Sequence, residues 1–306
     1  MTAVTAVTAV TSTSSLDALR RIGLCWHPSG QAGLRGPLLA LAESCDRAFR
    51  SLAAIWGADE ERHPASLPAD RLQRVDYLRS FPHQANFPAG LDPAGLEEFL
   101  AGEVVGDQGA VALTRLSPVS QVLTPAACYH LYSSLQGESF DRPHYVTTRN
   151  TCFRRESHYE PLRRLWSFSM REIVCIGTKP ETVAFLRQAR VAVDDFLHRM
   201  DLPVEWLTAT DPFFQPQSNP KYLLQRVQPT KHEATYGGDL AIASMNAHHD
   251  HFGAAFGLSR DGEPAHSACL AFGIERWLFA ITDRHGMDPG AWPRPAEAAQ
   301  KVQVRR

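Results

Sequence analysis

The sequence predicts an α+β fold in which an antiparallel sheet of about six strands is flanked by helices. Two strand-like runs within residues 150–177 are separated by a charged loop. Apolar residues recur at three- and four-residue spacing in residues 36–56 and 178–200, and this period indicates helices. Elements of both kinds are expected to pack in layers around one core.

Residues 1–16, which begin with a Thr-Ala-Val repeat, predict a disordered tail, and residues 17–306 are expected to form one domain with an irregular N-terminal region. The tail lacks the basic start and the apolar stretch of a signal peptide. A helical pattern begins at Ser15 and another at Gly36. Nothing before residue 110 sustains the heptads of a long coiled coil.

The clearest helix is expected over residues 178–200, because Thr178 and Glu181 form a capping-box pattern and Pro180 stands near the first turn. Its apolar side is expected to comprise Val183, Leu186, Val193, Phe196 and Met200. Its other side carries Arg187, Arg190 and Arg199.

Polar residues are unusually frequent at strand spacing in residues 150–177, which indicates a site rather than a core. Side chains alternate between the faces of a strand and advance about 3.3 Å per residue, so Phe168 and Glu172 should share one face, roughly 13 Å apart. An aromatic ring, a carboxylate and several arginines within that reach suit a nucleotide joined to a small acid. Residues 211–229, rich in Pro and Gln, predict a loop that crosses this site.

The formal net charge of −2 gives the chain no overall attraction for a polyanion, so transfer RNA is not an expected partner. No apolar run approaches the roughly 20 residues that cross a membrane. The six cysteines are scattered in a chain too large to need disulfides. Reduced cysteines in a cytoplasmic protein are therefore a simpler interpretation than disulfide bonds.

Residues 153–172 resemble motif 2 of class II aminoacyl-tRNA synthetases of the seryl type. The matching residues are Phe153, Arg154, Glu156, Arg164, Phe168 and Glu172. Residues 266–281 resemble motif 3, in which a strand and a glycine precede a helix with an arginine, here Arg276. The runs LTPAACYHLY, TTRNTCFRRE, SFSMREIVCIGT and NAHHDHFG are similar to the amino acid:carrier-protein ligases, truncated homologues of atypical zinc-dependent seryl-tRNA synthetases.

The resemblance implies a class II synthetase-like catalytic domain, a homodimer, that activates an amino acid with ATP and transfers it to the phosphopantetheine thiol of a carrier protein. Arg154 and Arg276 are the expected catalytic residues, because planar guanidinium groups match phosphate geometry. The expected ATP site comprises Arg154 at the α-phosphate, Glu156 at the adenine amino group, Phe168 stacked on the ring, Arg164 and Arg276 at the outer phosphates, and Glu233 as a magnesium ligand.

The resemblance further implies a zinc ion held by Cys128, Glu172 and Cys269, with an open position for the amine of the substrate. Thiolates and carboxylates suit zinc, and three protein ligands are typical of working sites. Asp211 and Asn246 are the candidates for binding the amino acid. A solvated loop aspartate is the other interpretation of Asp211.

Crowding by Trp166, Met170 and Phe213 beside the zinc ion would favour glycine or alanine as the substrate. The run His248–His251 offers further potential metal ligands, but only alternate residues of a strand converge. A structural or substrate-orienting role is therefore expected for these histidines.

Two other functions stay open. A compact seryl-type tRNA synthetase would share the ATP and metal residues, although the missing coiled coil and the near-neutral charge disfavour it. A non-catalytic regulatory paralogue would bind an amino acid or a partner protein. Such paralogues tend to lose their ATP contacts, whereas Arg154, Glu156 and Arg276 are all present here.

Overall fold

The computed structural model describes residues 13–304, so most of the expected tail lies outside the described residues. Helix α1 (Thr13–Arg21) already includes the last four residues assigned to that tail. A hairpin of β1 (Leu24–His27) and β2 (Gln31–Leu34) follows it. Within the described residues, no helix has both the length and the apolar composition that a membrane crossing requires.

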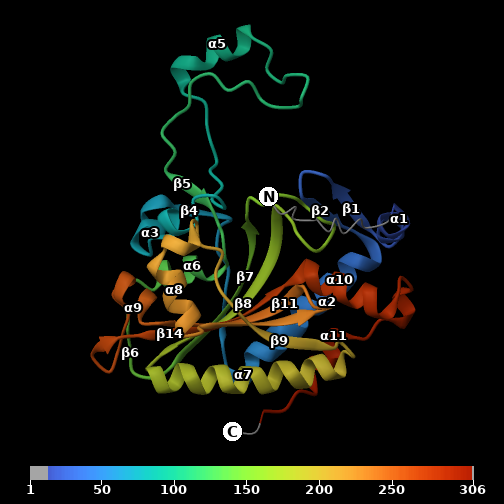
Figure 1. Cartoon of the computed structure of the whole chain (residues 1–306), viewed down its shortest axis with the longest axis vertical. Coiled ribbons are helices and arrows are strands. Elements are labelled where there is room, and N and C mark those ends of the chain that lie inside the picture. The colour runs from blue at the N-terminus through green and yellow to red at the C-terminus, as the bar shows by residue number, and fades with distance from the viewer. Residues whose placement is uncertain (1–12, 305–306) are drawn as a thin grey trace, which may run out of the picture.

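A seven-stranded sheet forms the centre of the molecule, in the order β3-β7-β8-β14-β11-β10-β9 (Figure 1). In that order its strands span Asp59–Glu61, His144–Phe153, Ser167–Gly177, His266–Gly273, Leu240–His249, Lys231–Tyr236 and Val204–Ala209. All neighbours pair antiparallel except the short edge strand β3, which lies parallel to β7. The α+β class with a largely antiparallel sheet is confirmed.

The two faces of the sheet differ, because successive side chains of a strand point to opposite sides. Ile173 of β8 belongs to the larger hydrophobic cluster, whereas its neighbour Val174 belongs to a second cluster. The larger cluster is completed by helices on one face, α2 (Gly36–Ala53), α7 (Lys179–Arg199), α10 (Ile274–His285) and α11 (Pro295–Gln300).

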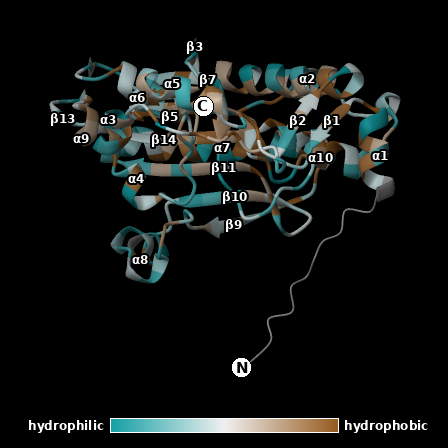
Figure 2. Cartoon of the chain, turned by 90° about the horizontal axis from the view of Figure 1, so that it is seen from above, coloured by the Kyte–Doolittle hydropathy of each residue, from teal (hydrophilic) through white to brown (hydrophobic). Residues whose placement is uncertain are grey.

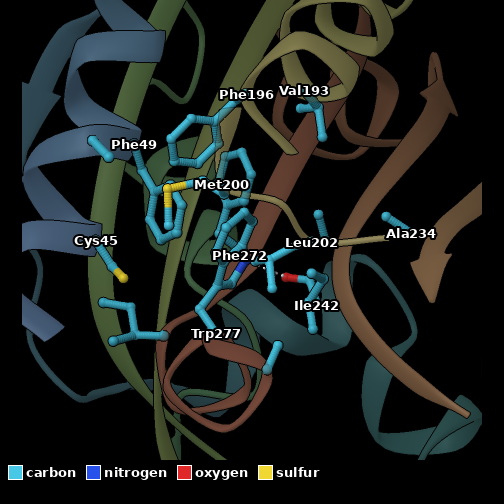
Figure 3. Packing of buried hydrophobic residues seen from close by; sticks show 14 of the residues in the cluster. Cys45, Phe49, Val193, Phe196, Met200, Leu202, Ala234, Ile242, Phe272 and Trp277 are labelled. Carbon is cyan, nitrogen blue, oxygen red and sulfur yellow. Dashed lines mark hydrogen bonds between the residues drawn. The ribbon is translucent and has the colours of Figure 1, made fainter. Parts of the chain in front are cut away.

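Aromatic stacking fastens these helices to the sheet (Figure 3). Phe49 of α2 stacks on Phe272 of β14 with their ring centroids 4.1 Å apart. Phe196 of α7 stacks on Trp277 of α10, and the Trp277 indole donates a 2.9 Å hydrogen bond to the Ile242 carbonyl of β11. This face is therefore closed by packing, which leaves the opposite face for a site.

Short helices cover one end of the opposite face through the second cluster. They are α3 (Ala69–Arg74), α4 (Tyr77–Ser80), α6 (Cys128–Ser134) and α9 (His251–Phe256). Small strands connect this region, namely β4 (Ser66–Pro68), β5 (Gln121–Leu123), β6 (Ser139–Phe140), β12 (Ser259–Arg260) and β13 (Glu263–Pro264).

Helix α7 begins with the expected capping box. The Thr178 hydroxyl accepts a hydrogen bond from the Glu181 N–H, and the Glu181 carboxylate accepts one from the Thr178 N–H. The expected apolar side is partly wrong, because Val183 is 48% exposed. The side chains that α7 buries are Thr182, Phe185, Ala189, Ala192, Val193, Phe196 and Leu197. Small and polar residues belong to the buried side of the helix, so a prediction based only on large apolar residues puts that side in the wrong place.

The expected loop over residues 211–229 contains a helix, α8 (Pro220–Val227), which lies below the β10–β9 edge of the sheet in Figure 2. The Asn219 side chain accepts a hydrogen bond from the Lys221 N–H, and Pro220 occupies the first helical position. Both are ordinary ways of starting a helix. The high Pro and Gln content concealed this helix.

Residues 86–120 form an arm that projects from the body and carries the short helix α5 (Leu96–Ala101) (Figure 1). Its two sides are joined near the base, where the Leu123 N–H donates to the Asn86 carbonyl and the Ser117 N–H donates to the Gly90 carbonyl. Its apolar side chains are exposed at Phe87, Leu96, Leu100, Val104, Val105, Val111, Leu113, Leu116 and Val119.

Candidate active site

The residues of the candidate site lie on the sheet face opposite the long helices. The strand register aligns Glu233, Ser244, Ala271 and Glu172 in one row across β10, β11, β14 and β8. The adjacent row on the same face consists of Lys231, Asn246 and Cys269. Residues far apart in the sequence therefore become cross-strand neighbours.

A small cavity of about 100 Å³ is lined by every residue expected to bind ATP. These residues are Arg154, Glu156, Arg164, Phe168, Glu233 and Arg276. An Arg164 Nη1–Glu156 Oε2 ion pair of 2.8 Å closes one side of the small cavity, and the Arg154 Cζ lies 5.1 Å from the centroid of the Phe168 ring. An aromatic ring under a guanidinium group offers a surface for a purine beside a site for its phosphate.

Arg276 lies in the first turn of α10, the helix that begins immediately after Gly273. Its guanidinium donates hydrogen bonds of 3.0 Å to the carbonyls of Arg163 and Ala241. Burial lowers the pKa of Arg276, and the nearby Arg154 guanidinium lowers it further. Positive charges that repel one another in a buried cavity, next to a helix N-terminus, are relieved by a bound polyanion.

A large cavity of about 490 Å³ adjoins the small one and is lined by all five residues expected to bind zinc or the amino acid. They are Cys128, Glu172, Asp211, Asn246 and Cys269. Met170 and Phe213 also line the large cavity. Trp166 lines neither cavity and instead donates a 2.8 Å hydrogen bond to Asn86 at the base of the arm. The expectation that Trp166 crowds the substrate is therefore wrong.

Cys128, Glu172 and Cys269 converge in the floor of the large cavity, each no more than 5% exposed. Burial raises the pKa of the Glu172 carboxyl, and this effect is opposed by hydrogen bonds that the carboxylate accepts from both thiols. The N–H groups of Ala127 and Cys128 also donate to Glu172 Oε1, at 2.9 and 3.3 Å. Burial raises the pKa of both thiols, and the Glu172 charge raises it further.

The residues are thus of the right kind for zinc, but their arrangement is that of a hydrogen-bonded cluster. Among residues 13–304, no group of three or more His, Cys, Asp or Glu side chains is arranged to hold a metal ion. The expectation of a zinc ion held by Cys128, Glu172 and Cys269 is therefore not supported by the geometry. Two thiols and a carboxylate that share one buried pocket nevertheless fit a cation chemically, because a bound cation would stabilise the deprotonated form of each group.

Asp211 faces the large cavity and is held by three contacts. The Gln225 amide of α8 exchanges hydrogen bonds of 2.9 Å with its N–H and its carboxylate. The Lys231 ammonium lies 3.2 Å from its Oδ1. Although burial acts to raise it, the pKa of Asp211 lies below its usual value, because of Lys231 and the Gln225 hydrogen bond. Sequence reasoning missed Lys231, although its position two residues before Glu233 puts both on one face of a strand.

His248 also lines the large cavity. Its Nδ1 lies 3.1 Å from the Tyr132 hydroxyl and 3.2 Å from the Ser267 hydroxyl. Burial lowers the pKa of His248 to about 4, so the ring is neutral at neutral pH. Its Nε2 lies 3.7 Å from the Cys269 sulfur, which itself accepts a hydrogen bond from Asn246.

No family model matches this chain. It is 35% identical, over 246 residues, to amino acid:acyl-carrier-protein ligase 1 of Bradyrhizobium diazoefficiens, a match that covers 78% of this chain and 74% of the ligase. The chain belongs to this ligase family. Ligase 2 of the same organism is 32% identical over 289 residues, which cover 88% of this chain and 83% of that protein. The family expected from the motifs is thereby confirmed.

The fold of this family member is that of class II synthetases. The seryl-tRNA synthetase of M. kandleri, solved in complex with A. aeolicus tRNASec, superposes with a TM-score of 0.77 at 21% identity. The match covers 95% of this chain and 62% of the synthetase, so the chain spans less than two thirds of that protein. The class II likeness expected from the two motifs is confirmed at the level of the fold.

Proposed function

We propose that the protein activates a small amino acid with ATP as an aminoacyl-adenylate and transfers it to the phosphopantetheine thiol of a carrier protein. One observation carries this proposal. The six residues expected to bind ATP line the small cavity, and the five expected to bind metal or amino acid line the large cavity beside it. Membership of a carrier-protein ligase family supports the same reaction.

The two cavities together suit the first half-reaction, in which the amino acid carboxylate attacks the α-phosphate and pyrophosphate leaves. Arg154 lines both cavities and would stabilise the charge that develops at the α-phosphate. Arg276 would hold the outer phosphates from its fixed position in the small cavity. Glu233 would bind magnesium there, as a carboxylate beside phosphates. Catalysis is then mainly positioning and charge stabilisation.

Zinc would be held by Cys128, Glu172 and Cys269, with the hydrogen bonds between the thiols and Glu172 replaced by metal bonds. Bound zinc would offer an open coordination position to the α-amino group of the substrate. Metal analysis of purified protein tests this independently of activity. About one zinc per chain is expected, and Cys269→Ser should lower it, whereas Cys175→Ser, at a buried cysteine on the other face of β8, should not. An equal zinc content in the two variants would show that zinc is not bound by Cys128, Glu172 and Cys269.

Glycine or alanine is the proposed substrate. The large cavity of about 490 Å³ has room for larger side chains. Selection would therefore depend on the amine being held close to Glu172, with Met170 and Phe213 beside it. One methyl group changes binding by only about 1–3 kcal/mol, so the preference between these two substrates should be modest.

The protein is further proposed to act as a homodimer through its arm. Residues 86–120 expose many apolar side chains and carry five acidic residues with one arginine. A second copy offers the complementary charge, because Arg21 and Arg35 are exposed near the β1–β2 hairpin. An acidic carrier protein would be repelled by the same arm.

The six cysteines, all unpaired, agree with a reducing compartment such as the cytoplasm.

The deciding experiment has two parts. Amino-acid-dependent exchange of labelled pyrophosphate into ATP, measured with each of the twenty amino acids, tests activation and should be fastest with glycine or alanine. Labelled amino acid is then incubated with ATP, a phosphopantetheinylated carrier protein and bulk tRNA. Hydroxylamine-labile label on the carrier is expected. Label on tRNA alone would establish the compact tRNA synthetase, and no exchange with any amino acid would establish the non-catalytic paralogue.

A further inference from the structure

Lys231 stands where the small and large cavities meet. It is the first residue of β10, and its side chain is 17% exposed. The cavities share five lining residues, namely Arg154, Met170, Lys231, Ser244 and Ala271. Arg154 and Lys231 are the charged members of this set, so the junction is bordered by two cations.

These two cations approach the junction from different sides of the sheet face. Arg154 directly follows β7, whereas Lys231 opens β10, and β8, β14 and β11 lie between these strands in the sheet. Met170, Ser244 and Ala271 come from the intervening strands. A molecule at the junction would therefore have a positive charge on each side of it.

The Lys231 ammonium lies 3.2 Å from Asp211 Oδ1 and 3.2 Å from Glu233 Oε1. The ammonium is shared between two carboxylates, and Glu233 is the proposed magnesium ligand, so magnesium bound to Glu233 would leave the ammonium available to a third carboxylate. Asp211 keeps a second donor in the Gln225 amide, at 2.9 Å, when the ammonium moves away. The four-carbon stem of lysine allows such a movement.

Adenylate formation brings two anions together, the carboxylate of the amino acid and the α-phosphate of ATP, and each needs a cation in a buried site. We propose that Lys231 binds the substrate carboxylate and holds it against the α-phosphate, which Arg154 stabilises from the other side. This inference rests on the proposed function. A carboxylate oxygen forms the bond to the α-phosphorus, the bond from that phosphorus to the bridging oxygen breaks, and pyrophosphate leaves with the electron pair. No proton is transferred in this step.

The test compares the amino acid with its amino alcohol, which keeps the amine and the side chain but lacks the carboxylate. The KM of the amino acid and the Ki of the amino alcohol are measured by pyrophosphate exchange in wild type, Lys231→Met and Lys231→Arg. Lys231→Met should raise the KM about 10- to 100-fold, as expected for loss of a hydrogen bond between charged groups, and leave the Ki within about twofold. Lys231→Arg should recover part of the affinity.

A structural role would give a different result, because a distorted cavity weakens both ligands. Equal losses for amino acid and amino alcohol in Lys231→Met, or no loss for either, would overturn the inference. The KM for ATP should change little in Lys231→Met, and thermal unfolding should show that the variant is folded. Failure of the wild type itself to exchange pyrophosphate would instead reject the proposed function, so the two failures are distinguishable.

Discussion

At the scale of single residues, Arg154 and Arg276 serve the same cavity but have different supports. Arg154 lies over the Phe168 ring, and its Nε donates one 3.2 Å hydrogen bond to the Pro125 carbonyl. Arg276 is partly buried and donates to the carbonyls of Arg163 and Ala241. Loss of the two side chains should therefore affect activity alike and stability differently.

We expect Arg154→Ala to slow pyrophosphate exchange by about 10²- to 10³-fold, the effect of losing one stabilising donor, with an unfolding midpoint near that of wild type. Arg276→Ala should lose exchange and also about 1 kcal/mol of stability, because the partly buried carbonyls of Arg163 and Ala241 lose a donor. Urea unfolding monitored by circular dichroism measures the second effect. Arg187→Ala, at an exposed position of α7, is the control. Wild-type exchange in Arg154→Ala would contradict the assignment.

Glu275, next to Arg276, gives a pH-dependent stability. Its carboxylate accepts 2.9 Å hydrogen bonds from the Ser169 N–H, yet burial raises the pKa of Glu275 to about 7. A carboxyl whose pKa is higher in the folded than in the unfolded chain contributes full stability below the unfolded value, and this contribution is lost as pH rises through the folded value.

Glu275→Gln keeps an acceptor for Ser169 but cannot ionise. Relative to this variant, wild type should therefore lose about 2–3 kcal/mol of unfolding free energy between pH 4.5 and pH 8. Urea titrations across this range measure the difference. A difference between the two proteins that does not change with pH would mean that Glu275 is not titrated in this window.

At the scale of elements, the capping box at the start of α7 matters because this helix packs along the closed face of the sheet. The Glu181 carboxylate accepts hydrogen bonds from the Thr178 N–H at 2.7 Å and from Arg260 Nη2 at 2.9 Å. The helix start is thus tied both to itself and to β12.

Thr178→Ala should reduce the unfolding free energy by about 1 kcal/mol, because the Glu181 N–H at the helix start loses its acceptor. Thr178→Ser, which keeps the hydroxyl, is the matched control and should retain most of the stability. Chemical denaturation at one pH suffices for the comparison. Equal stability of the Ala and Ser variants would show that the hydroxyl has no role in capping.

At the scale of the whole molecule, the most prominent feature is the arm of residues 86–120, which projects from the body (Figure 1). Its base contacts the loop between β7 and β8 through the Trp166–Asn86 hydrogen bond and through the Arg155 N–H, which donates to the Gln84 carbonyl at 3.2 Å. That loop contains Arg164 and borders the small cavity. Dimerisation through the arm would therefore also steady the cavity.

The double variant Leu100→Glu, Val105→Glu should convert the protein from dimer to monomer, because two exposed apolar side chains of the arm become charged. Light scattering after size-exclusion chromatography measures the mass. Val183→Glu, at an exposed apolar residue of α7, should leave the dimer intact. A wild-type protein that is monomeric at micromolar concentration would reject the proposed interface.

Local chemistry made much of this protein predictable. The strands β7, β8 and β14, the helix that starts with Thr178 and the position of Arg276 depend on spacing and caps within a few residues of one another. The two motifs likewise pointed to five ATP-site residues, the family resemblance outside them added Glu233, and all six line one cavity. Alternation along β8 put Phe168 and Glu172 on one face without knowledge of the partner strands.

Tertiary structure decided what depends on partners distant in the sequence. The parallel edge strand β3 is a strand through its pairing with β7, and the stripe that α7 buries follows from the sheet beneath it. Lys231 gained its place at the junction from the register that sets β10 beside β11. The Cys128, Glu172 and Cys269 cluster closes with hydrogen bonds rather than metal geometry, which no spacing of ligands predicts. Register and packing are non-local, so short-range periodicity alone does not determine them.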